Sequence, residues 1–221
     1  MAVANPVHHA VIPVLAGASL AVAAVAAVSL LSIVGLWLMV TYNGLVSRRV
    51  RVQNGFAQID VQLRRRHDLV PNLVATVKGA MAHERQTLEA VTQARAAAVA
   101  AEQRASAAGG SDAAATGALA GAEGALAAAL GRLMIVMERY PELKANASVL
   151  QLQEELVSTE NRIAFARQAY NDAVMTCNTR LAVFPDLLVA RLFSFTPAAL
   201  FETDDASRAL PTVDFGANRA S

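Results

Sequence analysis

The sequence lacks charge of either sign before Arg48, and it contains few aromatic residues and a single cysteine. Phe, Trp and Tyr make up 5% of the 221 residues although 55% are hydrophobic, because alanine supplies most of the excess. The lone Cys177 excludes an internal disulfide framework, and we interpret it as a small buried apolar residue. The net charge of +1 predicts no nucleic-acid partner. The abundance of alanine and the scarcity of strand signals predict an all-α fold.

An uncharged apolar run occupies residues 14–40, which is longer than the ~18–20 residues that cross a bilayer core. At ~1.5 Å per residue the run would measure about 40 Å, so we expect a tilt or a projecting end. It predicts a transmembrane helix over residues 14–42, after a short tail of residues 1–13. The residues predicted to lie at the membrane interface, where amphipathic rings and cations are favoured, are Trp37, Tyr42, Arg48, Arg49 and Arg51.

A cleaved signal peptide is the alternative interpretation of this run. Small residues over 21–27 imitate a cleavage site, but the N-terminal flank has no Lys or Arg and the apolar run is too long for a signal peptide. We therefore predict a retained single span. The arginines that follow it place the C-terminal domain in the cytoplasm by the positive-inside rule.

Apolar residues recur at alternating spacings of three and four after these arginines, which is typical of helices with one buried face. The spacing predicts an antiparallel four-helix bundle with long helices over residues 43–202, followed by a flexible C-terminal tail, 203–221. The fourth segment has the clearest pattern, because six apolar residues occupy one heptad position. They are Val149, Leu156, Ile163, Tyr170, Cys177 and Phe184.

Glycine, proline and capping residues predict where these helices end. Residues 109–112, Gly-Gly-Ser-Asp, interrupt an alanine-rich stretch, and Asp112 can cap the third helix. Asn146 or Ser148 can cap the fourth. Phe184–Pro185 ends the fourth helix, because the residue before a proline is disfavoured in helical conformation.

Residues 62–74, QLRRRHDLVPNLV, place three arginines, an aspartate and a proline inside a helical pattern. A proline inside a helix costs about 3 kcal/mol, whereas in the first turn it costs little. We therefore predict a helix reversal, in which one helix ends on the arginines and Asp68 caps the next, with Pro71 in its first turn. The apolar register runs on through Leu73 and Val77, so a kinked continuous helix stays the alternative.

Polar residues in the fourth segment also recur at spacings of seven. Glu160 and Arg167 share one helix face, and Asn171 and Asn178 share another. Buried polar groups must be paired, so the spacing predicts an interhelical network that fixes the helix register; a docking surface for another protein is the alternative. The candidate members are Asp60, Arg64, Arg65, Arg66, Glu160, Asn161, Arg167, Asn171 and Asn178.

Motifs for catalysis, cofactors or metals are weak in this sequence. His83-Glu84 begins like a zinc-protease helix, but Thr87 stands where the second histidine would be needed. His67 and Asp68 could pair as base and orienting group, yet no nucleophile accompanies them. We predict no catalytic, cofactor-binding or metal-binding residues, no cofactor, and a protein that is not an enzyme.

The segment FPDLLVARLFSF, residues 184–195, is short and apolar. We expect it to fold back onto the end of the bundle. Lying on the bilayer surface is the alternative.

Several long blocks carry a resemblance to a known family. They include YNGLVSRRVRVQNGFAQIDVQLRRRHDLVPNLVATVKG, HERQTLEAVTQARA, GRLMIVMERYPELKAN, LQEELVSTENRIAFARQAYNDAV and the terminal PTVDF. Over about residues 42–215 the chain resembles the LemA family. The resemblance implies a bacterial protein with one N-terminal span and a four-helix bundle, in the inner (cytoplasmic) membrane or a specialised internal membrane. It implies no established biochemical activity.

The sequence and the resemblance together favour a non-enzymatic membrane scaffold or adaptor. Its expected partners are the lipid bilayer and other membrane or envelope proteins, in one hypothesis a membrane protease. A self-assembling homo-oligomer that shapes the membrane is the alternative, and a cryptic hydrolase is a weaker one.

Overall fold

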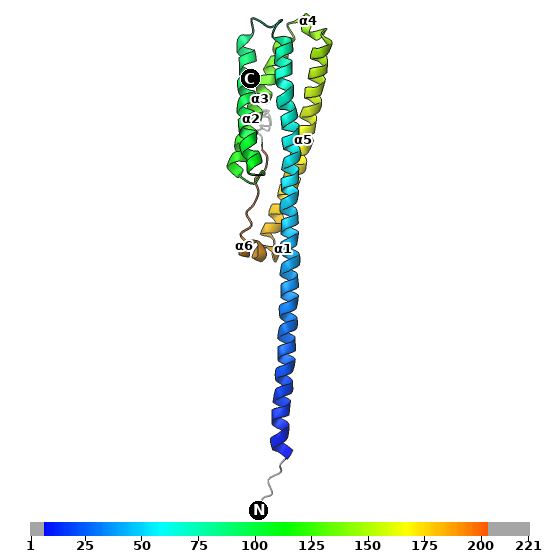
Figure 1. The fold of residues 1–221 in the computed structure, drawn as a ribbon, viewed down its shortest axis with the longest axis vertical. Coiled ribbons are helices and arrows are strands. Elements are labelled where there is room, and N and C mark those ends of the chain that lie inside the picture. Colours follow the sequence, from blue (N-terminus) through cyan, green and yellow to red (C-terminus); the bar gives the residue numbers. More distant parts are fainter. Residues whose placement is uncertain (1–6, 203–221) are drawn as a thin grey trace, which may run out of the picture.

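The computed structural model describes residues 7–202, and these form helices joined by short connections (Figure 1). Within these residues the predicted all-α class is confirmed, and no strand occurs. Residues 1–6 of the tail 1–13 and the whole of the tail 203–221 lie outside the described residues. The helices are α1 (Val7–Val77), α2 (Arg85–Ala107), α3 (Ala113–Met137), α4 (Pro141–Lys144), α5 (Ala147–Ala182) and α6 (Asp186–Leu192).

Helix α1 runs for 71 residues without interruption, so the predicted reversal at Asp68 and Pro71 is wrong. Pro71 lacks an N–H, which leaves the carbonyl of His67, four residues back, without its usual helical donor. Arg95 of α2 donates its Nε–H to that carbonyl at 2.6 Å. The neighbouring helix thus supplies the missing bond, and the alternative of a continuous helix holds. The chain reverses instead in the turn at residues 78–84.

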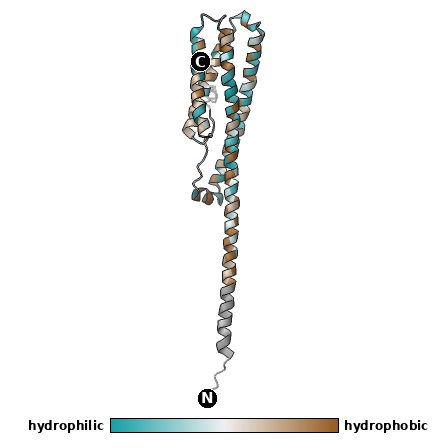
Figure 2. Cartoon of the chain, viewed as in Figure 1, coloured by the Kyte–Doolittle hydropathy of each residue, from teal (hydrophilic) through white to brown (hydrophobic). Residues whose placement is uncertain are grey.

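The N-terminal part of α1 extends beyond all other helices (Figure 1). Its side chains over residues 22–36 are exposed and almost entirely apolar, and Figure 2 shows this part of α1 as brown to pale. Leu31 is 71% exposed, for example. An exposed apolar helix of this length and composition meets the requirements of a membrane span. Among the side chains described from residue 22 onward, Trp37 and Leu38 are the first that pack against the rest of the protein.

Helices α5 and α2 pack against the C-terminal part of α1, and α3 packs against α2 (Figure 1). Helix α5 runs antiparallel to α1, since Tyr170 packs on Phe56 and the earlier Glu160 bonds to the later Arg66. One apolar cluster near the exposed end of α1 includes Phe56 and Tyr170. A second cluster at the far end includes Leu73. Figure 2 shows hydrophilic and hydrophobic residues interleaved along these helices.

The helix boundaries follow the predicted capping residues at two points. Asp112 accepts hydrogen bonds from the N–H groups of Ala114 and Ala115 at 2.9 and 3.3 Å. Asn146, the first of the two proposed caps of α5, accepts from Ser148 and Val149. These caps satisfy N–H groups that have no partner inside the helix.

The heptad residues of α5 form the face that packs into the interior. Five of the six predicted residues are buried, with Tyr170 at 0% exposure, whereas Phe184 is 74% exposed. Phe184 lies beyond the end of α5, where the chain bends by 92° into α6. The heptad pattern therefore predicted the packing of α5 up to its last turn.

Candidate functional site

A buried cluster of charged residues lies between the two apolar clusters, where α1, α3 and α5 meet. Arg66 is 2% exposed and forms an ion pair with Glu123 of α3. Its second guanidinium nitrogen donates to Glu160 of α5 at 2.6 Å. His67 Nε2 lies 2.8 Å from the other carboxylate oxygen of Glu123. Two adjacent residues of α1 thereby join three helices through charge-assisted hydrogen bonds.

A second group of polar residues extends this cluster toward α2. Arg64 donates to Glu102 Oε1 at 3.1 Å and pairs with Asp60 at 3.0 Å. Ser106 donates its hydroxyl to Asp60. Arg65, on another face of α1, lies 3.8 Å from Glu155 of α5. The three consecutive arginines thus reach three different helices rather than ending one.

Burial and neighbouring cations determine the charge state of His67. Desolvation, with additional repulsion from Arg66 and Arg95, lowers the pKa of His67 to about 4. The imidazole is therefore neutral at pH 7, and its bond to Glu123 requires the proton on Nε2. Burial, together with the adjacent Asp60, raises the pKa of the Glu102 carboxyl.

This arrangement holds its buried charged groups in pairs. Each of the carboxylates of Glu102, Glu123 and Glu160 faces an arginine or histidine partner, and the one hydroxyl in the group, that of Ser106, donates to Asp60. Among residues 7–202, no group of three or more His, Cys, Asp or Glu residues could hold a metal ion. Breaking such a buried pair costs about 3–5 kcal/mol, because it leaves one charge unpaired.

Two acidic members of this cluster, Glu102 and Glu123, were not predicted. Glu123 is the only charged residue between Asp112 and Arg132, in an apolar helix. A lone charge in such a helix must either face solvent or find a partner. Glu102 follows Arg95 by seven residues, so the two share a helix face. These two signals could have identified both residues.

Asn171 and Asn178 hold the chain after α6 rather than another long helix. Asn178 bonds the backbone N–H and carbonyl of Ala198 at 3.0 and 2.8 Å. Asn171 does the same for Phe201, at 2.9 and 3.4 Å. Tyr170 donates its hydroxyl to the carbonyl of Ala199 at 2.8 Å. Asn171 and Asn178, seven residues apart on α5, therefore hold the segment after α6 along that helix.

The remaining members of the predicted network lie apart from one another. Arg167 places its guanidinium over the ring of Phe201, 5.2 Å from the centroid. Asn161 is exposed. The shared face of Glu160 and Arg167 therefore serves two different contacts, one with Arg66 and one with the C-terminal segment.

The predicted membrane-interface residues lie where the exposed apolar part of α1 ends. Trp37 packs partly against the first apolar cluster, and Tyr42 contacts the ring of Phe193 at 4.8 Å. The next three cations continue the same helix toward the charged cluster. Of these, Arg48 bonds the carbonyl of Gly44 at 3.0 Å, whereas Arg49 and Arg51 are exposed.

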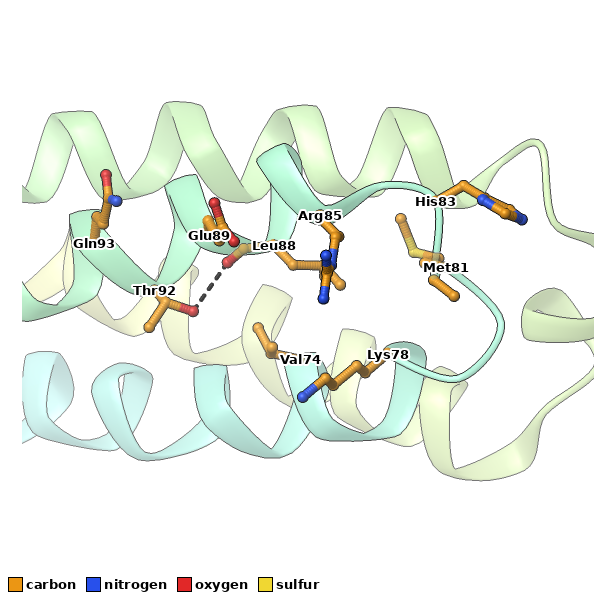
Figure 3. A pocket seen from close by; sticks show the side chains of 10 residues that line it. Val74, Lys78, Met81, His83, Arg85, Leu88, Glu89, Thr92 and Gln93 are labelled. Carbon is orange, nitrogen blue, oxygen red and sulfur yellow. Dashed lines mark hydrogen bonds between the residues drawn. The ribbon is translucent and has the colours of Figure 1, made fainter.

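A groove of about 850 Å³ lies at the opposite end, between the last turns of α1 and the first turns of α2. Val74, Met81 and Leu88 provide apolar lining. Figure 3 shows Lys78 and Arg85 extending across this groove from its two sides. Glu89 is the one carboxylate that lines it, so the groove combines an apolar lining with two cations and one anion.

The family model that matches this chain is described as the LemA family, over residues 55–215. This range covers most of the chain. The chain belongs to the LemA family. The match includes α2, α3 and α5 and the part of α1 that carries the charged cluster, and it begins after the apolar segment. No curated protein matches the chain.

Proposed function

We propose that this LemA family protein is a single-span membrane scaffold that presents a protein-docking groove at a fixed height above the bilayer. The observation that carries the proposal is the continuity of α1 from exposed apolar residues to a buried core. From Val40 to Val77 a helix rises about 55 Å. Because this helix has no break, it works as a rigid spacer between the membrane and the groove. The groove is therefore held away from the membrane surface.

A single span is favoured over several, although α3 is also long and apolar enough to cross a membrane. The apolar residues of α3 pack inside the protein: Leu119, Leu126 and Leu133 are fully buried. Glu123 of α3 pairs with Arg66, far along α1 from the exposed apolar stretch. One flat bilayer around residues 22–40 would therefore not include α3. The arginines that follow the span favour a cytoplasmic location for the bundle, in the inner membrane or an internal one.

The proposed docking site is the groove between α1 and α2. Its apolar lining, with Lys78 and Arg85 outnumbering the single carboxylate of Glu89, suits an amphipathic segment that carries acidic residues. This choice supports the adaptor hypothesis for a membrane or envelope partner. The face of α5 is less suitable, because Glu160, Asn171 and Asn178 are engaged within the chain.

The experiment compares two full-length charge-reversal variants extracted from native membranes in mild detergent. Arg85→Glu changes the groove, whereas Arg162→Glu changes an exposed arginine on α5. Mass measurement and identification of co-purifying chains should reveal a stoichiometric partner that Arg85→Glu loses and Arg162→Glu keeps. A complex of this chain alone would support self-assembly instead. A partner kept by both variants would contradict the groove assignment.

A further inference from the structure

The short helix α6 presents apolar side chains to solvent on one side while its other side packs into the protein. Val189 and Ala190 are buried in the first apolar cluster. Leu188 is 54% exposed and Leu192 is 68% exposed. Phe184, at the preceding bend, is 74% exposed. Several large apolar side chains exposed together indicate an interaction surface.

This surface lies at the level where the exposed apolar part of α1 meets the rest of the protein. Phe193, directly after α6, contacts Tyr42 of α1 with 4.8 Å between ring centroids. Phe195 contacts the same ring at 5.7 Å. Trp37 packs against the same cluster as Val189. Figure 1 shows α6 beside α1 at the base of the packed helices, directly above the long extension.

The axis of α6 is oriented as expected for a helix that lies in the plane of a membrane crossed by α1. Helix α6 is bent by 92° from α5, and α5 runs along α1. Helix α6 therefore lies across α1, so a membrane crossed by α1 would lie parallel to α6. The charges at this level also match an anionic membrane: Arg191 of α6 is exposed, whereas Asp186 is buried and pairs with Arg180 at 3.0 Å.

We propose that α6, with Phe184 and Phe193, is an interfacial foot that rests in the headgroup layer of the membrane crossed by α1. The inference rests on the proposed membrane anchoring and adds a second, lateral contact to it. The occupant of the exposed face is lipid, because Phe193, directly after α6, contacts Tyr42 of α1, a few residues beyond the exposed apolar residues 22–36. The foot also fixes how far the packed helices stand above the bilayer.

The test measures the membrane depth of spin labels in the full chain, reconstituted in vesicles of phosphatidylcholine with phosphatidylglycerol. The buried Cys177 is replaced by alanine, and single cysteines carry the labels. Two labels replace Leu188 and Leu192 of the foot. Two control labels replace Leu150 and Val157, which are similarly exposed apolar residues of α5 far from the foot. A label at Ile33 reports the span.

Collision rates with oxygen, enriched in lipid, and with a water-soluble nickel complex give the depth of each label. The proposal predicts that the foot labels and the span label favour oxygen, while the two α5 controls favour nickel. A span label in lipid with foot labels as aqueous as the controls overturns the foot but leaves the anchoring intact. A span label in water overturns the anchoring and the foot together. Controls in lipid as well would mean that the whole protein lies flat, which also overturns the proposal.

Discussion

The side chains of Arg66 and His67 show how single residues specify the register of three helices. Both point into the interior, and both bond to the same carboxylate of Glu123. A slip of one residue in α1 would remove both partners at once and leave three ionisable groups buried without compensation. We therefore expect the cluster to contribute more to the uniqueness of the fold than an apolar layer of equal volume would.

The first prediction concerns the pH dependence of stability at His67. Its pKa is about 4 in the folded protein and about 6.5 when unfolded, so protons bind the unfolded chain preferentially between these values. The stability that His67 contributes is complete above pH 6.5 and is lost as pH falls toward 4. His67→Gln keeps an Nε2 donor for Glu123 but does not titrate. Between pH 7 and pH 5 the unmodified protein should lose about 2 kcal/mol more unfolding free energy than His67→Gln.

Chemical unfolding of both proteins at the two pH values, followed by circular dichroism, measures this difference. The pKa shifts of neighbouring groups such as Glu102 are common to both proteins, so their effect on stability cancels in the comparison. Parallel pH profiles for the two proteins would show that His67 is not buried in its neutral form.

The second prediction concerns the pairing of Pro71 with Arg95. Arg95→Ala should cost about 1–3 kcal/mol of unfolding free energy, because the His67 carbonyl loses its donor. Pro71→Ala restores a backbone N–H for the same carbonyl, so Arg95→Ala should cost much less in that background. The four unfolding free energies of this double-mutant cycle give the coupling directly.

Arg104→Ala is the matched control, because Arg104 also donates to a backbone carbonyl but at an exposed position. It should cost less than 1 kcal/mol in either background. Equal costs of Arg95→Ala with and without Pro71 would rule out the compensating role of Arg95.

At the scale of elements, the turn between α2 and α3 depends on two glycines with different surroundings. Gly109 and Gly110 both have positive φ, 58° and 70°. A Cβ at Gly109 would meet open space, whereas one at Gly110 would lie 2.5 Å from the ring of Phe56. The turn therefore packs directly on α1, and the second glycine is required for two reasons.

The third prediction follows from this difference. Gly109→Ala should cost about 1–2 kcal/mol from backbone conformation alone. Gly110→Ala should cost about 1–3 kcal/mol more, because Phe56 must move. Thermal unfolding of the two variants side by side measures the difference. Equal midpoints would mean that the turn does not rest on Phe56.

Most helices could be predicted from the sequence, but the first turn was placed at residues 68–71 instead of 78–84. Apolar periodicity and capping residues such as Asp112 and Asn146 identified α3 and α5, because these are local signals. Pro71 misled the prediction, since its compensation by Arg95 is a tertiary contact that no local pattern contains. The apolar register through Leu73 carried the correct information, and it conflicted with the proline.

The polar site was predictable only in part, for the same reason. The spacing of Glu160, Asn171 and Asn178 identified residues that make interior or segment contacts, but not their partners. Partners such as Glu123 come from helices distant in sequence, and a single sequence does not specify which helices meet. The lone charge of α3 was the available signal.

At the scale of the whole molecule, α1 joins two environments with opposite requirements. Its first part exposes apolar side chains over residues 22–36, and its last part buries Leu63, Leu73 and Val77 among other helices. Because the helix is continuous, the position of its apolar part in the membrane determines where the packed helices lie. The proposed foot and groove both depend on this continuity. The foot lies where α1 leaves the membrane, and the groove lies at the C-terminal end of α1.

The most direct test of this account measures one distance along α1. Gln53→Cys and Ala75→Cys place spin labels at two exposed positions, in a Cys177→Ala background. A continuous helix separates the two backbone positions by about 33 Å, because each residue rises ~1.5 Å. A reversal at Asp68–Pro71 would bring them within roughly 15 Å, side by side on neighbouring helices. A pulsed electron-spin resonance distance near 33 Å is the predicted result, and one near 15 Å would contradict the continuous rod.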